Sequence, residues 1–262
     1  MKSSTANKWG DDFVDAQTAT NRSVIWASQG PAGSGKTHFA LTAPDPIAYF
    51  LFDPGGLKGL MDNPLFKLKE VKLIDFSKMM DWGRLEKDAR MRRALDVINK
   101  FDRSWDIALR NARSIVIDKD SELWETIRYA HDEVFSPTPK NFYELNLDYR
   151  ALFIQAESAG ANLALIRGLK EKWGVTGYNR EGKKQMGFTG EQIARGHKEA
   201  EELVQVNFAH RWDDVAREWK VKILEKCRLG SAIDLMGTEY PNLDYDMLVN
   251  DLLFPDAACW VC

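Results

Sequence analysis

Cysteine, long apolar runs and an excess of positive charge are all scarce in this sequence. The chain of 262 residues has only three cysteines, which excludes a disulfide-stapled scaffold and favours the reducing cytoplasm. No uninterrupted apolar run exceeds six residues, so we expect no transmembrane helix and no membrane partner. The N-terminal residues contain no apolar segment of the kind that a secretory signal needs. The net charge of −3 excludes a globally basic nucleic-acid binder but allows a local basic patch.

Apolar residues are plentiful enough for a large core, at 44% of the chain against 29% charged residues. Short apolar runs typical of strands alternate with longer helix-like stretches. This alternation predicts an α/β fold whose mostly parallel sheet carries helices on both faces. The expected strands span 23–27, 47–52, 71–76, 114–117 and 162–166, and the expected helices span 37–43, 84–110, 121–134 and 144–158.

Three parts of the chain differ in composition. Residues 1–22 are polar and predict a flexible N-terminal arm. Residues 23–230 hold all the expected strands and form the predicted core. Residues 231–262 carry six acidic residues and no lysine or arginine, so they predict an acidic tail, and its apolar residues 248, 249 and 252–254 suggest that it partly docks as a helix.

The strongest motif lies between the first expected strand and the first expected helix. It matches G-x-x-x-x-G-K-[ST] at every fixed position, and it consists of Gly30, Pro31, Ala32, Gly33, Ser34, Gly35, Lys36 and Thr37. Glycines let the backbone N–H groups of such a loop converge on phosphate oxygens. Lys36 would supply a positive charge to the β- and γ-phosphates, and the Thr37 hydroxyl would bind Mg²⁺. The motif therefore predicts an ATP·Mg²⁺ site.

A loop of this kind needs a carboxylate at the end of a second buried strand to complete the Mg²⁺ shell. Asp118 and Asp53 both end such strands, and each could instead cap the helix that follows. We favour Asp118 because a long helical stretch separates its strand from the loop. Glu122 lies four residues further on, where it would either polarise the attacking water or favour the dipole of the next helix.

Three more segments, at 51–57, 113–124 and 162–173, complete a family likeness. With the phosphate loop, they make the chain resemble the RecA-like P-loop ATPases of bacteriophages, a group that includes AAA-family ATPases and Sak-type single-strand annealing recombinases. The resemblance implies a RecA-like ATPase core that assembles head to tail in a ring or filament, with ATP at the subunit interfaces. It also implies action on single-stranded DNA in recombination or replication in the host-cell cytoplasm, with a phage single-strand binding protein as a candidate partner.

Two positions depart from the family pattern. RecA-like ATPases usually place a catalytic glutamate two residues after the aspartate of the 47–52 strand, where this chain has Gly55. That role would pass to Asp53 or Glu122, or hydrolysis would be slow. The strand at 162–166 usually presents a polar sensor, where this chain has Arg167, which can stabilise transferred phosphoryl charge but cannot orient water as an amide does. The sequence therefore supports ATP binding better than fast ATP turnover.

A basic segment follows that strand, and we expect it to form a loop over about 170–190. Residues 167–198 contain eight lysines or arginines against three acidic residues, a local balance of +5, with glycines and aromatics interleaved. Cations that follow a phosphate backbone and aromatics that stack on bases are typical of single-stranded DNA binding. The candidate phosphate contacts are Lys170, Lys172, Arg180, Lys183 and Lys184, and the candidate stacking residues are Trp173, Tyr178 and Phe188. The competing interpretation is a solvated β-hairpin with ordinary surface lysines.

The basic segment allows other functions as well. The resemblance places Lys170 and Lys172 where RecA-like subunits reach into a neighbour's ATP site. The alternative to a DNA-binding ATPase is an ATP-gated assembly or adaptor protein with little turnover and no DNA role. A metabolite kinase is disfavoured because we find no arginine-rich lid.

Overall fold

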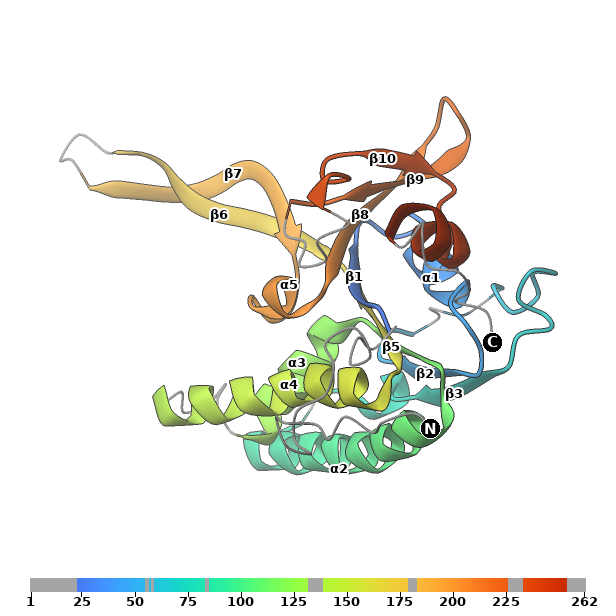
Figure 1. The fold of residues 1–262 in the computed structure, drawn as a ribbon. Coiled ribbons are helices and arrows are strands. Elements are labelled where there is room, and N and C mark those ends of the chain that lie inside the picture. The colour runs from blue at the N-terminus through green and yellow to red at the C-terminus, as the bar shows by residue number, and fades with distance from the viewer. Residues whose placement is uncertain are drawn as a thin grey trace, which may run out of the picture.

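An eight-stranded sheet lies at the centre of the molecule (Figure 1). The computed structural model describes residues 23–54, 57, 59–82, 85–131, 139–178, 183–225 and 233–253. The strand order is β10-β9-β8-β1-β5-β4-β2-β3, in which the six strands from β8 to β3 are parallel, β9 is antiparallel to β8, and β10 is antiparallel to β9. The strands are β1 (Ile25–Gln29), β2 (Ile47–Leu51), β3 (Val71–Asp75), β4 (Ser114–Asp118), β5 (Asn162–Arg167), β8 (Val206–Asp213), β9 (Glu218–Ile223) and β10 (Glu239–Pro241).

Helices cover both faces of this sheet. The long helices α2 (Lys87–Asn111), α3 (Asp120–Ala130) and α4 (Pro139–Ala159) pack on one face, together with the short α5 (Ala200–Leu203). Helix α1 (Lys36–Leu41) and the π-helical turn η2 (Met247–Leu253) pack on the other face, and a 3₁₀ turn, η1 (Ser77–Met79), follows β3. The prediction of an α/β fold with a mostly parallel sheet is thereby confirmed.

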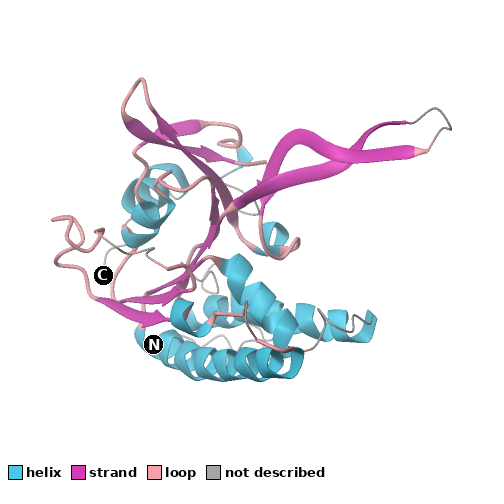
Figure 2. Cartoon of the chain, turned by 180° about the vertical axis from the view of Figure 1, so that it is seen from behind, coloured by secondary structure: helices cyan, strands magenta, loops and turns pink. Residues whose placement is uncertain are grey.

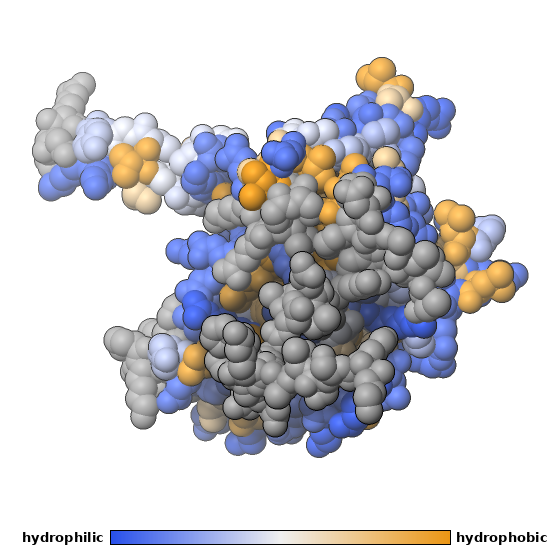
Figure 3. Space-filling view, in the orientation of Figure 1, coloured by the Kyte–Doolittle hydropathy of each residue, from blue (hydrophilic) through white to orange (hydrophobic). Residues whose placement is uncertain are grey.

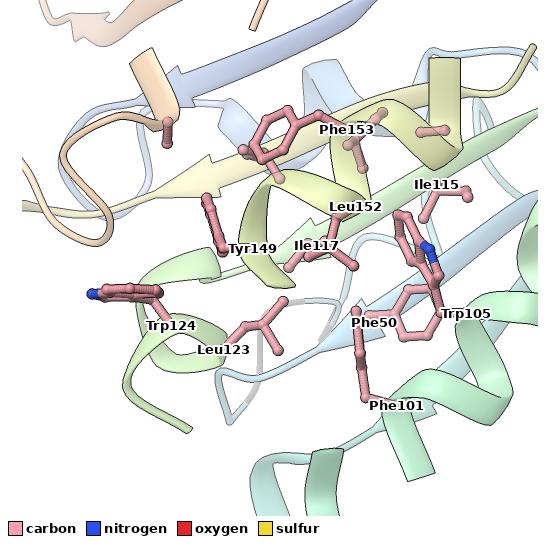
Figure 4. Packing of buried hydrophobic residues seen from close by; sticks show 14 of the residues in the cluster. Phe50, Phe101, Trp105, Ile115, Ile117, Leu123, Trp124, Tyr149, Leu152 and Phe153 are labelled. Carbon is pink, nitrogen blue, oxygen red and sulfur yellow. The ribbon is translucent and has the colours of Figure 1, made fainter. Parts of the chain in front are cut away.

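Alternation along the strands assigns each side chain to one of two cores. In β1, Ile25 packs with the α2–α4 face, whereas Trp26 packs with the α1 face. Helix α2 buries residues spaced three or four apart, so a single apolar stripe faces the sheet. Figure 4 shows Phe101 and Trp105 of this stripe beside Phe50 of β2, with ring centroids 5.2 and 6.0 Å from that of Phe50.

The acidic C-terminal segment docks on the α1 face, as its apolar residues predict. Leu248, Val249 and Leu253 of η2 are buried in that core. The Tyr245 hydroxyl donates a hydrogen bond of 2.7 Å to Oδ1 of Asn162 in β5. The same segment supplies the edge strand β10. Residues 233–253 therefore pack on the core rather than extending away from it.

The basic segment is a long β-hairpin and not a loop, so the loop expected over about 170–190 is wrong for most of its length. Strands β6 (Leu169–Tyr178) and β7 (Lys184–Ala194) form a separate two-stranded antiparallel sheet that projects from the body (Figures 1 and 2). The alternative interpretation as a hairpin is correct for the backbone. Within the described part of the chain, no helix is long and apolar enough to cross a membrane.

Candidate nucleotide-binding site and the projecting hairpin

The phosphate loop lies between the end of β1 and the start of α1, as predicted. Strand β1 pairs with β5 on one side and with β8 on the other. The strands β2 to β5 all lie on the β5 side of β1, and the later strands β8 to β10 lie on its other side, so the strand order reverses at β1. Ligands of open α/β sheets bind at the carboxyl ends of the strands beside such a switch point. The loop 30–35 occupies that place.

Neighbouring strands require glycine at two positions of the loop. A Cβ on Gly30 would lie 2.4 Å from the main-chain oxygen of His210 in β8. Gly35 has a left-handed φ of 89°, and a Cβ there would lie 2.9 Å from the ring of Trp219 in β9. Strands β8 and β9 therefore pack directly against the loop, and a larger residue at Gly30 or Gly35 would displace the loop.

Lys36 folds back over the loop. Its Nζ donates hydrogen bonds to the main-chain oxygens of Gly30 and Pro31, at 2.9 and 2.6 Å, and lies 3.3 Å from Oγ of Ser34. Burial lowers the pKa of Lys36, while the nearby carboxylates of Asp118 and Asp53 act in the opposite direction. The ammonium is thus partly removed from water and held at the mouth of the loop.

A cavity of about 590 Å³ opens beside the loop, within the size range of small-molecule sites. It is lined by Gly30, Pro31, Ala32, Gly33, Lys36, Thr37, Asp53, Pro54, Asp118, Lys119, Ile166, Arg167, Gly168, Leu169, Gln192 and Arg195. Most of the predicted phosphate cradle borders the cavity. Ser34 and Gly35 do not, and Oγ of Ser34 instead donates to the oxygen of Pro31 at 2.9 Å.

Asp118 faces the loop from the end of β4. It is 5% exposed, and its Oδ2 accepts a hydrogen bond from the hydroxyl of Tyr49 in β2. Burial raises the pKa of Asp118, and the hydrogen bond from Tyr49 opposes that rise. Burial and Asp118 together raise the pKa of Tyr49 far above its ordinary value, and a hydrogen bond from the Thr37 side chain acts against them. Asp118 is thus fixed by the Tyr49 phenol, and it lines the same cavity as Thr37.

These two residues fit the demands of Mg²⁺. Both offer oxygen ligands, which this cation prefers, and Lys36 lies beside them with the charge that a phosphate would meet. Thr37 and Asp118 are the residues that would hold the ion.

Asp53 and Glu122 lie on either side of one lysine. Nζ of Lys119 is 3.2 Å from Oδ1 of Asp53 and 4.0 Å from Oε1 of Glu122. Asp53 borders the cavity beside the loop, whereas Glu122 borders an adjoining cavity of about 530 Å³ between α3 and the root of the hairpin. Of the two candidates for the missing glutamate, only Asp53 lies in the cavity of the phosphate loop.

Arg167 directs its guanidinium to the opposite face of the sheet. Its Nε lies 3.4 Å from Oδ2 of Asp120, its Nη2 donates to the main-chain oxygen of His197 at 2.9 Å, and the side chain is 2% exposed. Tyr149 donates to the same Oδ2 of Asp120 at 2.9 Å. A sensor role would require the guanidinium to face a phosphate. Arg167 lines the cavity, but its guanidinium is held in a buried ion pair with Asp120 instead.

The buried pair predicts a large effect on stability. Arg167→Ala would leave Asp120 buried without its counter-ion, so we expect a loss of about 3–5 kcal/mol in the free energy of unfolding. Arg150→Ala removes an arginine from an exposed pair with Glu199 and should cost about 1 kcal/mol or less. Denaturant unfolding of both variants tests this prediction. Equal losses in the free energy of unfolding would show that the buried Arg167–Asp120 pair stabilises the fold no more than the exposed pair does.

Four residues of the site were missed by the sequence interpretation: Tyr49, Lys119, Gln192 and Arg195. Tyr49 lies inside an apolar run and looks like a core residue. Lys119 follows Asp118 directly, which was an available signal. Gln192 and Arg195 reach the cavity because β7 returns to it, which composition alone does not reveal.

The hairpin presents an aromatic face and a glycine face. Trp173 pairs with Phe188 and Val175 with Met186 across the strands, while Gly174 opposes Gly187 on the other side. The predicted stacking residues Trp173, Tyr178 and Phe188 are 64%, 65% and 44% exposed. Figure 3 shows hydrophobic residues on the projecting hairpin among hydrophilic neighbours.

The predicted phosphate contacts are exposed where the structure describes them. These are Lys170, Lys172, Lys183 and Lys184. Lys172 forms an ion pair of 2.6 Å with Glu191 of the facing strand. Arg180 lies outside the described residues, as do residues 1–22 of the expected N-terminal arm. At the root of the hairpin, Gly168, Leu169, Gln192 and Arg195 line the cavity of the phosphate loop, so the two features are contiguous.

No model of a known protein family matches the chain, and no curated protein matches it at a significant level.

Proposed function

We propose that this protein binds ATP with Mg²⁺ in the cavity beside the phosphate loop. The observation that carries the proposal is the convergence, in that one cavity, of the loop, Lys36 and Thr37 with Asp118 from another strand. Lys36 would exchange its main-chain partners for the phosphates, and Thr37 and Asp118 would hold the metal. This arrangement is the one that RecA-like P-loop ATPases need, and it supports assigning the chain to that fold.

Hydrolysis needs both charge stabilisation and a group that orients the attacking water. Mg²⁺ and Lys36 would stabilise charge that develops on the transferred phosphoryl group. The group that would orient the attacking water is Asp53, which borders the cavity but is engaged with Lys119. We therefore propose slow turnover of ATP to ADP and phosphate, raised by a neighbouring subunit or by DNA.

We further propose that the hairpin binds single-stranded DNA, so that the protein acts in phage recombination or replication as a head-to-tail ring or filament. Exposed aromatics and lysines on one projecting element support this function, because stacking and phosphate contacts both need accessible side chains. The root of the hairpin in the ATP cavity offers a path by which nucleotide and DNA would influence each other. A phage single-strand binding protein remains a candidate partner.

The alternative function, an ATP-gated assembly or adaptor protein, is favoured by one observation. Val175 and Met186, exposed by 45% and 62%, extend the aromatic face into an apolar strip that also suits a protein partner. Binding of single-stranded DNA at low salt, with and without ATP, separates the two functions. No measurable affinity would leave the adaptor function as the better proposal.

The salt dependence of binding should report the lysine contacts. Each phosphate contact on a single strand contributes a slope of about −0.7 to log affinity against log salt. Replacing Lys183 and Lys184 together with alanine should flatten that slope by about 1.4 if both touch phosphate. The matched control is Lys72→Ala with Lys78→Ala, two exposed lysines of β3 and η1, for which the slope should stay unchanged. Equal flattening in both double variants would contradict a specific role of the hairpin.

Loss of an aromatic side chain should change the DNA affinity but not its salt dependence. Trp173→Ala should weaken DNA binding by about 1–3 kcal/mol with the salt slope nearly unchanged, because stacking releases no cations. Tyr143→Ala on α4, where the side chain is 66% exposed, is the control and should have no effect. Fluorescence titration at several salt concentrations provides both numbers. Neither variant should alter ATP binding, and unchanged DNA affinity in Trp173→Ala would remove the stacking role.

A further inference from the structure

Two buried tyrosines each donate a hydrogen bond to a buried aspartate, one pair on each face of the sheet. Tyr49 of β2 donates to Oδ2 of Asp118 on the α1 face. Tyr149 of α4 donates to Oδ2 of Asp120 on the α2–α4 face, at 2.9 Å. Both tyrosines are 1% exposed. Only the first pair borders the cavity of the phosphate loop, because Asp118 lines that cavity and Asp120 does not.

Burying a hydroxyl is unfavourable unless it finds a partner, so the phenol of Tyr49 is explained by what it contacts. Phenylalanine would fill the same space in β2 without that cost. The Tyr49 hydroxyl donates its hydrogen bond to Asp118. Asp118 is one of the two residues assigned above to the metal. A phenol that bonds one carboxylate oxygen fixes the rotation of the carboxylate and leaves the other oxygen for a ligand.

We propose that Tyr49 is a positioning residue for the metal, which holds Asp118 in the arrangement that accepts nucleotide-bound Mg²⁺. The inference rests on the proposed function, since it needs ATP to bring the ion. It assigns to a residue inside an apolar strand the outer-shell role that hydrogen-bonded partners of metal ligands commonly have. Tyr49 acts through Asp118 and does not itself touch the nucleotide.

The test separates metal binding from nucleotide binding. The affinity for a fluorescent ATP analogue is measured in excess EDTA and again in excess free Mg²⁺, and the ratio of the two affinities is the gain from the metal. In Tyr49→Phe the affinity in EDTA should stay within about twofold, whereas the gain should fall roughly 10–100-fold, the usual loss when an outer-shell partner is removed. Tyr149→Phe is the matched control and should leave both quantities unchanged.

Two further variants keep the test decisive. Tyr49→Met lacks the hydroxyl but fills the space with a different and adaptable side chain, so a packing defect of the phenylalanine variant would not be shared. In an Asp118→Asn background the Tyr49→Phe change should cause no additional loss of the gain, because its effect passes through Asp118.

The outcomes are distinguishable from failure of the ATP site itself. A wild-type protein that binds no ATP analogue in either buffer would refute the proposed function. Wild-type binding with an unaltered Mg²⁺ gain in Tyr49→Phe and Tyr49→Met would overturn only the role of Tyr49. An equal loss of the gain in Tyr149→Phe would overturn it too, because that pair lies on the other face of the sheet.

Discussion

Replacing Lys36 with alanine is expected to lower the affinity for ATP by roughly 100-fold or more, while the protein stays folded. Among the described residues, the hydrogen bonds of the Lys36 ammonium all go to the phosphate loop, and Lys36 is not part of either apolar core. Loss of a partly buried charge contact with an ionic ligand costs about 2–5 kcal/mol, and 1.4 kcal/mol corresponds to about tenfold in affinity. Equilibrium titration with ATP·Mg²⁺ gives the affinity, and thermal unfolding checks the fold.

Lys69→Ala is the matched control for this variant. Lys69 also donates to two main-chain oxygens, those of Thr42 and Ala43, at 3.1 and 2.6 Å, but it does so at the other end of α1. We expect it to change stability slightly and ATP affinity not at all. Unchanged ATP affinity in a folded Lys36→Ala protein would remove the lysine from the site, and with it the interpretation of the loop.

The second large effect is expected at the carboxylates. Asp118→Asn should reduce ATP hydrolysis by roughly 100-fold or more, in the range seen when one electrostatic contact to the reacting group is lost. Asp53→Asn should cost less. Asp118 is buried beside Thr37 and Tyr49, whereas the side chain of Asp53 is 44% exposed and paired with Lys119. Rates of phosphate release from the two variants, at saturating ATP and Mg²⁺, decide between them.

The asparagine variant is a mild change to the fold. Its amide oxygen can still accept the hydrogen bond from Tyr49, so the buried hydroxyl keeps a partner. If Asp53→Asn proves the more damaging substitution, the two strands have been assigned the wrong roles, and Asp53 rather than Asp118 belongs to the metal shell.

Local features of the site were predictable from the sequence, whereas its distant contacts were not. The strand, loop and helix around Gly30–Thr37 follow from one contiguous motif. Asp118 was found because a buried strand that ends in a carboxylate is visible in the sequence alone. The partner of Asp118, Tyr49, comes from a strand 69 residues earlier, and a tyrosine within an apolar run gives no sign of a polar role.

Arg167 shows why the position of a residue in the sequence is not enough to predict its role in the site. It ends β5 where a sensor would lie, but alternation along the strand turns its side chain toward Asp120 and away from Lys36. The same limit applies to β8, which pairs with β1 and thereby fixes the loop at Gly30, although about 180 residues separate the two strands in sequence. Pairing across such a distance leaves no periodic signal in either segment.

The hairpin was predictable only in part. Its charge and aromatic content were evident, and alternation at Trp173 and Val175 and again at Met186 and Phe188 was an available sign of strands. Glycines at 174 and 187 interrupted that pattern and favoured a loop. In the structure these glycines pair with each other across the two strands, beside the side chains of Thr176 and Thr189.

The most direct test of the central claim is a calorimetric titration of the wild-type protein with ATP in the presence of Mg²⁺. The structure-based proposal predicts saturable binding of one ATP per chain, with a dissociation constant in the range of about 1 µM to 1 mM that is usual for enzyme substrates. Absence of saturable binding by folded protein up to roughly 1 mM ATP would contradict it, because a cavity with a complete phosphate loop, Lys36 and Asp118 would then not serve a nucleotide.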